Sequence, residues 1–215
     1  MDFRRPLTLI TPTLDGDVLA ALAAADVEFS GRELARRARY GSTEGIRRAA
    51  DRLVGEGIVA RRSVGGAHLY RLNREHIAAP WIEAMATLPE QLIDRLRSMI
   101  DEWDEPASLV FLFGSVARDE ASSASDLDLL VVRRGSCDAD SDAWRSQLVA
   151  LQQAATALTG NDARVLEIGE AEIGRDRVTS VLEEVSRDGI ALLGSKRELQ
   201  RLLDRAQQAE PMQRS

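Results

Sequence analysis

The sequence has 215 residues, of which only Cys137 is a cysteine, and it contains no apolar run of 18 residues. One cysteine excludes an intrachain disulfide, and this usage is typical of proteins from a reducing cytoplasm. Without such an apolar run, a membrane-spanning helix is not expected. The first residues, Met1 to Pro6, are not followed by the apolar core of a signal peptide. We therefore expect a soluble cytoplasmic protein without membrane contact.

Clusters of histidine and cysteine are also lacking. The two histidines, His68 and His76, have no second histidine or cysteine at the spacing of a zinc site. Internal repeats and low-complexity segments are not evident either. The sequence therefore predicts no zinc site and no repeat architecture, and both histidines are interpreted as structural.

Charge is abundant but unevenly distributed. The chain is 44% apolar and 29% charged, which is typical of a globular protein, and its length allows two modest domains. The net charge of −7 argues against nucleic acid coating the whole surface. Residues 1–76 contain 13 arginines and 10 acidic residues, whereas the rest of the chain contains 15 basic and 25 acidic residues. We expect a basic domain over 1–78 and an acidic domain over 79–215, with Pro80 near the boundary.

The acidic part contains two apolar runs, 108–113 and 127–132, which predict buried strands. Asp126 and Asp128 lie at the start of the second run. Because residues i and i+2 of a strand point to the same face, their carboxylates are expected side by side. Two neighbouring negative charges favour a bound cation, and hard divalent ions such as Mg²⁺ or Mn²⁺ take oxygen ligands and bridge to phosphates.

The link after the first run begins with Gly114 and Ser115. Glycine allows the backbone to approach a ligand closely, and serine adds a hydroxyl at the turn. With the two carboxylates, these residues predict a metal-dependent site for nucleotide phosphates. The alternative is a surface turn with two solvated aspartates.

Gly114-Ser115, ten intervening residues and Asp126-x-Asp128 together resemble the signature of the DNA polymerase β-like nucleotidyltransferase superfamily. The subgroup that it is most similar to is the minimal nucleotidyltransferases of prokaryotes. The resemblance is strong over 108–132 and looser over 90–195. It implies an α/β domain with a small mixed sheet and flanking helices. It also implies an NTP as substrate or ligand, Mg²⁺ or Mn²⁺, and transfer of a nucleoside monophosphate to a hydroxyl acceptor.

The resemblance also implies roles for individual residues. Gly114 and Ser115 would line the triphosphate pocket, Arg118 would add a charged contact, and Asp126 and Asp128 would hold the metal and take part in catalysis. The family usually has glycine after this arginine, whereas this chain has Asp119, followed by Glu120. Additional carboxylates beside an anionic ligand weaken the phosphate site unless they point away or hold metal.

The superfamily typically adds a third carboxylate from a later strand, which the sequence predicts at 163–168. The position that aligns with it falls at or near Arg164, which cannot ligate a metal. Glu167 is the acid inside the strand and is the tentative third catalytic residue. Asp162, at the start of the strand, is the other candidate.

The basic part predicts three helices and a hairpin. Apolar spacing indicates a helix over 14–24, Ser30 and Glu33 form a capping-box pattern for a helix to about residue 38, and a third helix is expected over 43–56. A hairpin is predicted from 58–63 and 67–72, with Gly65-Gly66 at its tip.

This order of elements resembles a winged helix-turn-helix domain of the kind found in MarR-like and ArsR-like regulators. The resemblance implies binding of double-stranded DNA, with the third helix in the major groove and the hairpin near the backbone. The expected DNA-binding residues are Ser42, Thr43, Arg47, Arg48, Arg52, Arg61 and Arg62. The alternative is a protein-interaction module whose arginines form a solvated face.

The remaining elements complete an α+β prediction for the chain. The sequence predicts helices over 89–103 and 140–158, a short helix from Glu170, another from Ser180, a strand over 190–193 and a terminal helix capped by Ser195.

Three functions are compatible with these patterns. The first is an enzyme that transfers a nucleoside monophosphate. The second is a DNA-binding transcriptional regulator whose nucleotidyltransferase-like domain binds nucleotide without turnover. The third is an antitoxin, since minimal nucleotidyltransferases are often paired with a toxin partner protein. Self-association as a homodimer is a further expectation.

Overall fold

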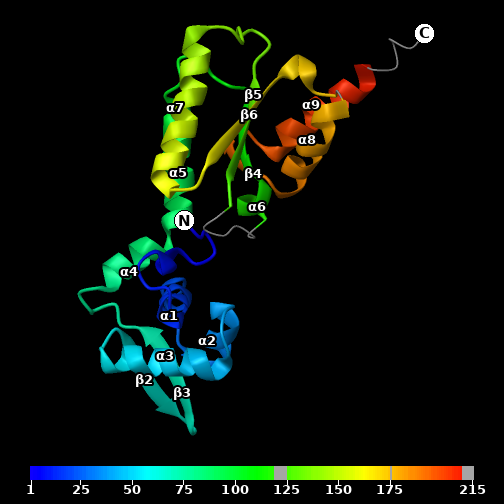
Figure 1. Ribbon diagram of the computed structural model, residues 1–215. Coiled ribbons are helices and arrows are strands. Elements are labelled where there is room, and N and C mark those ends of the chain that lie inside the picture. Colours follow the sequence, from blue (N-terminus) through cyan, green and yellow to red (C-terminus); the bar gives the residue numbers. More distant parts are fainter. Residues whose placement is uncertain (119–124, 175, 210–215) are drawn as a thin grey trace. The chain divides into compact units, whose positions relative to one another are not determined.

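The computed structural model describes residues 1–118, 125–174 and 176–209. The chain divides into two compact units, Asp2–Gln91 and Leu92–Ser215, and the second also includes Met1 (Figure 1). The sequence placed the boundary after residue 78. The division falls later because Ala79 and Ile82, on the helix that follows, are buried in the apolar core of the first unit.

The first unit combines short helices with a small antiparallel sheet. Its elements are η1 (Pro6–Leu9), α1 (Leu14–Ala23), β1 (Phe29–Ser30), α2 (Gly31–Ala38), α3 (Thr43–Gly55), β2 (Val59–Val64), β3 (Ala67–Leu72) and α4 (Ala79–Ala86). The strand order is β1-β3-β2, and both pairings are antiparallel. The helices begin where the sequence predicted them, because Ser30 and Ser42 accept hydrogen bonds from the backbone N–H groups of the first turns of α2 and α3.

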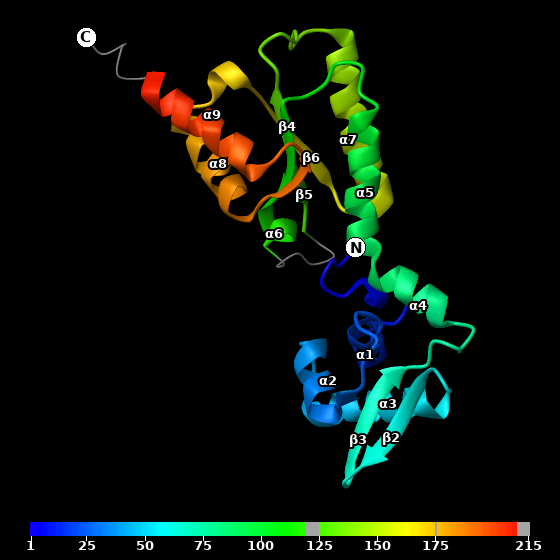
Figure 2. The same ribbon diagram turned by 180° about the vertical axis from the view of Figure 1, so that it is seen from behind.

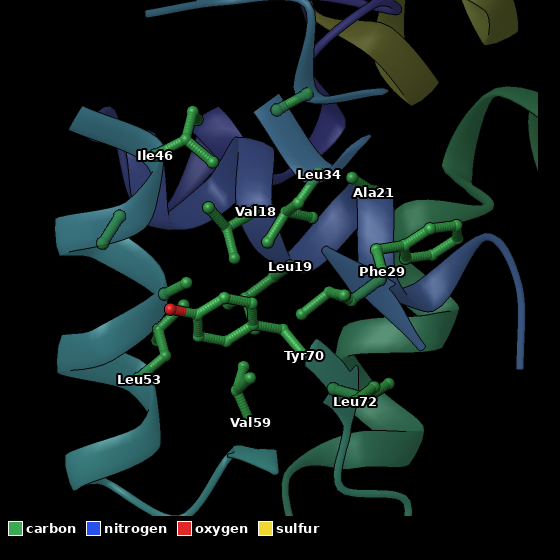
Figure 3. Packing of buried hydrophobic residues seen from close by; sticks show 14 of the residues in the cluster. Val18, Leu19, Ala21, Phe29, Leu34, Ile46, Leu53, Val59, Tyr70 and Leu72 are labelled. Atoms are coloured by element: carbon green, nitrogen blue, oxygen red, sulfur yellow. The ribbon is translucent and has the colours of Figure 1, made fainter. Parts of the chain in front are cut away.

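The core of this unit is centred on Tyr70 of β3 (Figure 3). Tyr70 and Leu72 share the buried face of the strand, since side chains alternate along it. Val18 of α1, Leu34 of α2 and Ile46 of α3 close the cluster from the helices and are fully buried. The Tyr70 hydroxyl emerges beside α3 and donates a 3.0 Å hydrogen bond to Asp51. The hairpin is therefore held against α3 by apolar packing and by the hydrogen bond from Tyr70 to Asp51.

The second unit is built on a mixed four-stranded sheet. Its elements are α5 (Leu88–Asp101), β4 (Leu109–Phe113), α6 (Gly114–Ala117), β5 (Leu127–Arg133), α7 (Asp142–Thr159), β6 (Ala163–Gly169), η2 (Glu170–Glu172), α8 (Asp176–Asp188), β7 (Ile190–Leu193) and α9 (Lys196–Ala209). The strand order is β6-β5-β4-β7, with β5 and β6 parallel and the other pairings antiparallel.

Helices cover both faces of this sheet. Figures 1 and 2 show α5 beside α7 on one face and α8 beside α9 on the other. Phe111 of β4 and Leu130 of β5 pack towards Leu182 of α8 and Leu199 of α9. Burial on both faces explains why these strands are continuously apolar rather than alternating. The predicted α+β class and the small mixed sheet are confirmed.

Two element predictions need correction. Ser180 does not begin a helix but lies inside α8, so the predicted capping box at this position is wrong. The helix predicted to extend to Trp103 ends at Asp101. In the part of the chain that the structure describes, no helix is both long and apolar enough to cross a membrane.

Candidate functional site

Two carboxylates mark the start of β5. Asp126 immediately precedes the strand and Asp128 is its second residue, so the two are separated by one buried residue, Leu127. In the sheet, Asp128 lies opposite Phe113, the last residue of β4, and opposite Arg164 on β6. The carboxylate pair thus lies where β4 ends and the chain turns into α6.

Gly114 allows this turn to pass directly against Asp128. Its φ of +71° lies in the left-handed region that favours glycine. A Cβ at this position would overlap the carboxylate oxygen Oδ2 of Asp128 and would lie 3.2 Å from its Cγ. Any side chain would therefore displace the carboxylate. Ser115 follows as the second residue of α6, so the structure brings Gly114, Ser115 and Asp128 together.

The electrostatic field at Asp128 favours a positive charge. Burial and the neighbouring charge of Asp126 raise the pKa of Asp128, with a smaller contribution from Glu184 of α8, while Arg164 and Arg118 oppose these effects. Raising the pKa of a carboxyl means that its ionised form is unfavourable unless a cation compensates. Glu184, which sequence reasoning missed, also forms an ion pair with Arg118. The expected phosphate contact of Arg118 therefore has a carboxylate partner within the unit.

Arg164 is the cation next to the carboxylate pair. Its Nη1 lies 2.9 Å from Oδ2 of Asp126, and its Nε lies 3.7 Å from Oδ2 of Asp162. The parallel register of β5 and β6 places Arg164 directly beside Asp128. The family resemblance implied a third carboxylate at or near this position, and the residue that the structure places here is an arginine.

Glu167 does not join the site, contrary to its tentative assignment as a third catalytic acid. It lies opposite Val131, three residues along the strand from the Asp128–Arg164 pair, which corresponds to about 10 Å. Its carboxylate accepts a 2.8 Å hydrogen bond from Nε of Arg133 at the other end of β5. Asp162 contacts Arg164 rather than the pair itself. The sequence pattern correctly placed Glu167 in a strand. The register in which β6 pairs with β5 then places its side chain away from the carboxylate pair.

Within residues 1–118, 125–174 and 176–209, the carboxylates at the site suit one divalent cation, and Asp119 and Glu120 lie outside these described residues. Asp126 and Asp128 provide oxygen ligands on one side of the strand, and Mg²⁺ is commonly held by one or two carboxylates together with substrate phosphates. Among the residues that the structure describes, no group of three or more acidic, histidine or cysteine side chains could hold a metal ion. Such an ion would stabilise the negative charge of a phosphoryl group. Asp126 and Asp128 are the residues that would hold it.

The expected DNA-binding residues lie on α3 and the hairpin of the first unit. Ser42 caps α3 by accepting a 3.0 Å hydrogen bond from the N–H of Gly45, and Thr43 is the first residue of the helix. Arg52 forms an ion pair with Asp15 of α1, and Arg62 forms one with Glu28. The guanidinium groups of Arg52 and Arg62 are therefore paired with carboxylates of the first unit itself.

The other three arginines of this surface share two acids. Glu44 lies 2.8 Å from Arg47 and 3.8 Å from Arg48. Asp51 lies 3.4 Å from Arg47 and 3.0 Å from Arg61 of β2. The arginines of α3 and of the hairpin thus lie close together in the structure. Glu44 and Asp51, which the sequence did not assign to this surface, lie between them.

The fold is of the mixed α+β class, and its four-stranded sheet has a pair of carboxylates at one end, where Asp128 lies against the backbone of Gly114. Comparison of the sequence with protein families adds that residues 91–171 match the model of the nucleotidyltransferase domain. This segment contains Gly114, Ser115, Asp126, Asp128 and Arg164. This match supports the nucleotidyltransferase resemblance that the sequence motif predicted for this part of the chain.

Solved structures of toxin–antitoxin complexes are also similar to the chain. A toxin–antitoxin structure with AMP-PNP is 16% identical, and the match covers 56% of this chain and 87% of the other, with a TM-score of 0.40. A structure of the toxin–antitoxin MntA-HepT is 15% identical over 57% of this chain and 87% of the other, with a TM-score of 0.36. No curated protein matches the chain.

Proposed function

We propose that the second unit binds a nucleoside triphosphate together with one divalent cation and transfers the nucleoside monophosphate to a hydroxyl acceptor. The observation that carries this proposal is the carboxylate pair of Asp126 and Asp128, held against Gly114 in a segment that matches the nucleotidyltransferase domain. Two carboxylates on one side of a strand suit a cation that also binds phosphate oxygens.

In this reaction, the acceptor hydroxyl oxygen forms a bond to the α-phosphorus while the bond from that phosphorus to the pyrophosphate oxygen breaks. The hydroxyl proton passes to solvent water, and pyrophosphate leaves with the electron pair of the broken bond. The residues of the chain act mainly by positioning and by charge. Gly114 lets the backbone pass directly against Asp128, Ser115 offers a hydroxyl, and Asp126 and Asp128 hold the cation.

The test is an assay of pyrophosphate release and of nucleotide binding with Mg²⁺, each of the four NTPs and a panel of hydroxyl acceptors. Asp126→Asn is expected to weaken nucleotide binding about tenfold and to abolish release, because it removes a charged ligand of the cation. Asp140→Asn is the matched control, since it also breaks a surface ion pair, with Arg145, but lies outside the site. Equal behaviour of the two variants would contradict the proposal.

A second candidate function, nucleotide binding without turnover, is favoured by Arg164. This arginine lies beside Asp128 where a third carboxylate would serve a second cation and the acceptor hydroxyl. In this case, binding of nucleotide to the second unit would act as a signal to the first unit. The same assay separates the candidates, because a binder retains nucleotide affinity that depends on Asp126 but releases no pyrophosphate with any acceptor.

For the first unit, we propose a winged helix-turn-helix domain that binds double-stranded DNA through α3 and the β2–β3 hairpin. The support is the order of three helices and a hairpin, with Arg47, Arg48 and Arg61 exposed on neighbouring elements. Phosphate contacts make such binding depend steeply on salt. Arg48→Ala should weaken binding to the chain's own promoter DNA and reduce the salt slope by about one. Absence of binding at low salt would refute this proposal.

A toxin partner and a homodimer also remain proposals for this chain. Both are tested by co-expression with the product of the neighbouring gene, followed by size-exclusion chromatography with light scattering. A stable complex of both chains supports the toxin partner, a self-associated species of twice the chain mass supports the homodimer, and a monomer alone contradicts both.

A further inference from the structure

Arg164 is the feature of the second unit that the proposed function leaves without a role. Its guanidinium lies between two carboxylates, 2.9 Å from Asp126 and 3.7 Å from Asp162, and its backbone lies beside Asp128. Three aspartates of the same sheet end therefore surround one arginine. The side chain of Arg164 is 64% exposed.

Exposure makes the ion pair between Arg164 and Asp126 exchangeable. Ion pairs between side chains that water reaches are weak, because both charges are well solvated when they separate. The side chain of Asp126 is 36% exposed, so solvent also reaches the carboxylate. Arg164 is therefore close enough to neutralise Asp126, but it is not locked there by packing.

A divalent cation and the guanidinium would compete for the same carboxylate, that of Asp126. Arg164 contacts Oδ2 of Asp126, on the carboxylate that would ligate the metal together with Asp128. Two positive groups at one carboxylate repel each other, so binding of the metal disfavours the ion pair. The released guanidinium keeps its charge and its fork of N–H donors, which matches the oxygens of a phosphate.

We propose that Arg164 is an exchangeable counter-cation, which neutralises Asp126 before metal binds and passes to the phosphates of the nucleotide when a divalent cation takes the carboxylate. This inference rests on the proposed function, since it concerns the same site. It has a thermodynamic consequence. The metal alone must displace Arg164, whereas metal with nucleotide gives the guanidinium a new anionic partner, so the two ligands bind with positive coupling.

Arg118 has a different ion-pair partner from Arg164. It forms an ion pair with Glu184 of α8. Arg164 therefore differs from Arg118 in that its own partner is the carboxylate that the metal would use. Coupling between metal and nucleotide is consequently expected to depend on residue 164.

The experiment is a calorimetric titration of the full chain with Mn²⁺ alone, and then with a non-hydrolysable ATP or GTP analogue at saturating Mn²⁺. The variants are Arg164→Gln and, as a matched control, Arg187→Gln, which removes an equally exposed arginine from an ion pair with Asp188 on α8. We expect Arg164→Gln to bind Mn²⁺ about fivefold more tightly, because no guanidinium competes. We expect it to bind the analogue about tenfold more weakly, because a charged phosphate contact is lost.

Opposite shifts for the two ligands are the signature of exchange, and the control variant should show neither. If Arg164→Gln leaves the Mn²⁺ affinity unchanged, or if both affinities move in the same direction, the inference is overturned while the proposed function stands. If neither ligand binds the wild-type chain or any variant, the proposed function and the inference both fail. Arg164→Lys keeps the charge but not the fork, so it should retain the weak Mn²⁺ binding and lose part of the analogue affinity.

Discussion

The α3 surface of the first unit and the β5–β6 end of the second unit are opposite in charge but neutralised in the same way. On the first, arginines predominate, and Glu44 and Asp51 lie between Arg47, Arg48 and Arg61. On the second, aspartates predominate, and Arg164 lies between Asp126 and Asp162.

An excess of one charge on a surface does not leave that charge free to bind a ligand, because both surfaces pair their charged side chains internally. A polyanion at α3 must draw Arg47 away from Glu44, and a metal at β5 must draw Asp126 away from Arg164. Because these ion pairs are exposed, each exchange costs little free energy. If the two surfaces bind the ligands proposed for them, the affinities should be lower than composition alone suggests.

The two regions differ in how rigidly the charged residue is placed. Asp128 is pressed against the backbone of Gly114, whereas the α3 arginines are held by side-chain contacts alone.

The largest expected effect comes from Gly114→Ala. Alanine at a φ of +71° is strained by about 1–2 kcal/mol, and its Cβ displaces the carboxylate of Asp128. We expect the free energy of unfolding to fall by about 2–3 kcal/mol and binding of Mn²⁺ to be lost. Urea unfolding and calorimetry measure the two effects.

Gly160→Ala is the matched control for that variant. Gly160 ends α7 with a φ of +72°, and an added Cβ meets no atom within 4 Å. It should lose about 1–2 kcal/mol from backbone strain while Mn²⁺ binding is retained. Equal losses of stability and metal binding in both variants would show that contact with Asp128 is unimportant.

A smaller effect is expected from Glu44→Gln on α3. The change removes the carboxylate that pairs with Arg47 and Arg48, so both guanidiniums become available to phosphates. If the α3 surface binds DNA, affinity at constant salt should rise about threefold. Glu56→Gln, beyond the end of α3, changes the net charge equally and serves as the control. A gain of the same size in both variants would attribute the effect to net charge rather than to the ion pairs.

The smallest effect is expected from Asp128→Asn. Burial and Asp126 raise the pKa of Asp128 in the folded chain, so folding favours the protonated carboxyl. The stability that this preference provides is present below the pKa of the unfolded chain, about 4, and is lost as pH rises through the raised value. At pH 7 the ionised group therefore opposes folding, and asparagine should raise the free energy of unfolding by about 0.5 kcal/mol.

Chemical denaturation at several pH values measures this last effect. The advantage of Asp128→Asn over the wild type should shrink as the pH falls towards 4, because the wild-type carboxyl then becomes protonated. An advantage that does not change with pH would mean that the charge of Asp128 is not its cause.

Much of the fold could be predicted from local patterns in the sequence. The capping box of Ser30 and Glu33 marks the start of α2, and the continuous apolar runs mark β4 and β5 within one residue. These signals are local, because helix caps and strand alternation depend on residues a few positions apart. The extent of α8 and the division after Gln91 were not predictable in this way, since they depend on packing between distant segments.

The candidate site was likewise predictable only in the features that depend on residues close together in the sequence. The sequence predicts that the carboxylates of Asp126 and Asp128 are neighbours, since a strand has a two-residue period, and β5 begins between them at Leu127. The groups that surround the two carboxylates follow from the tertiary structure. The register of β5 with β6 brings Arg164 to the carboxylates and leaves Glu167 with Arg133, and a shift of that register would exchange their neighbours. Register depends on the pairing of strands 30 or more residues apart in the sequence. Local sequence patterns therefore could not predict that Arg164 lies beside the two carboxylates.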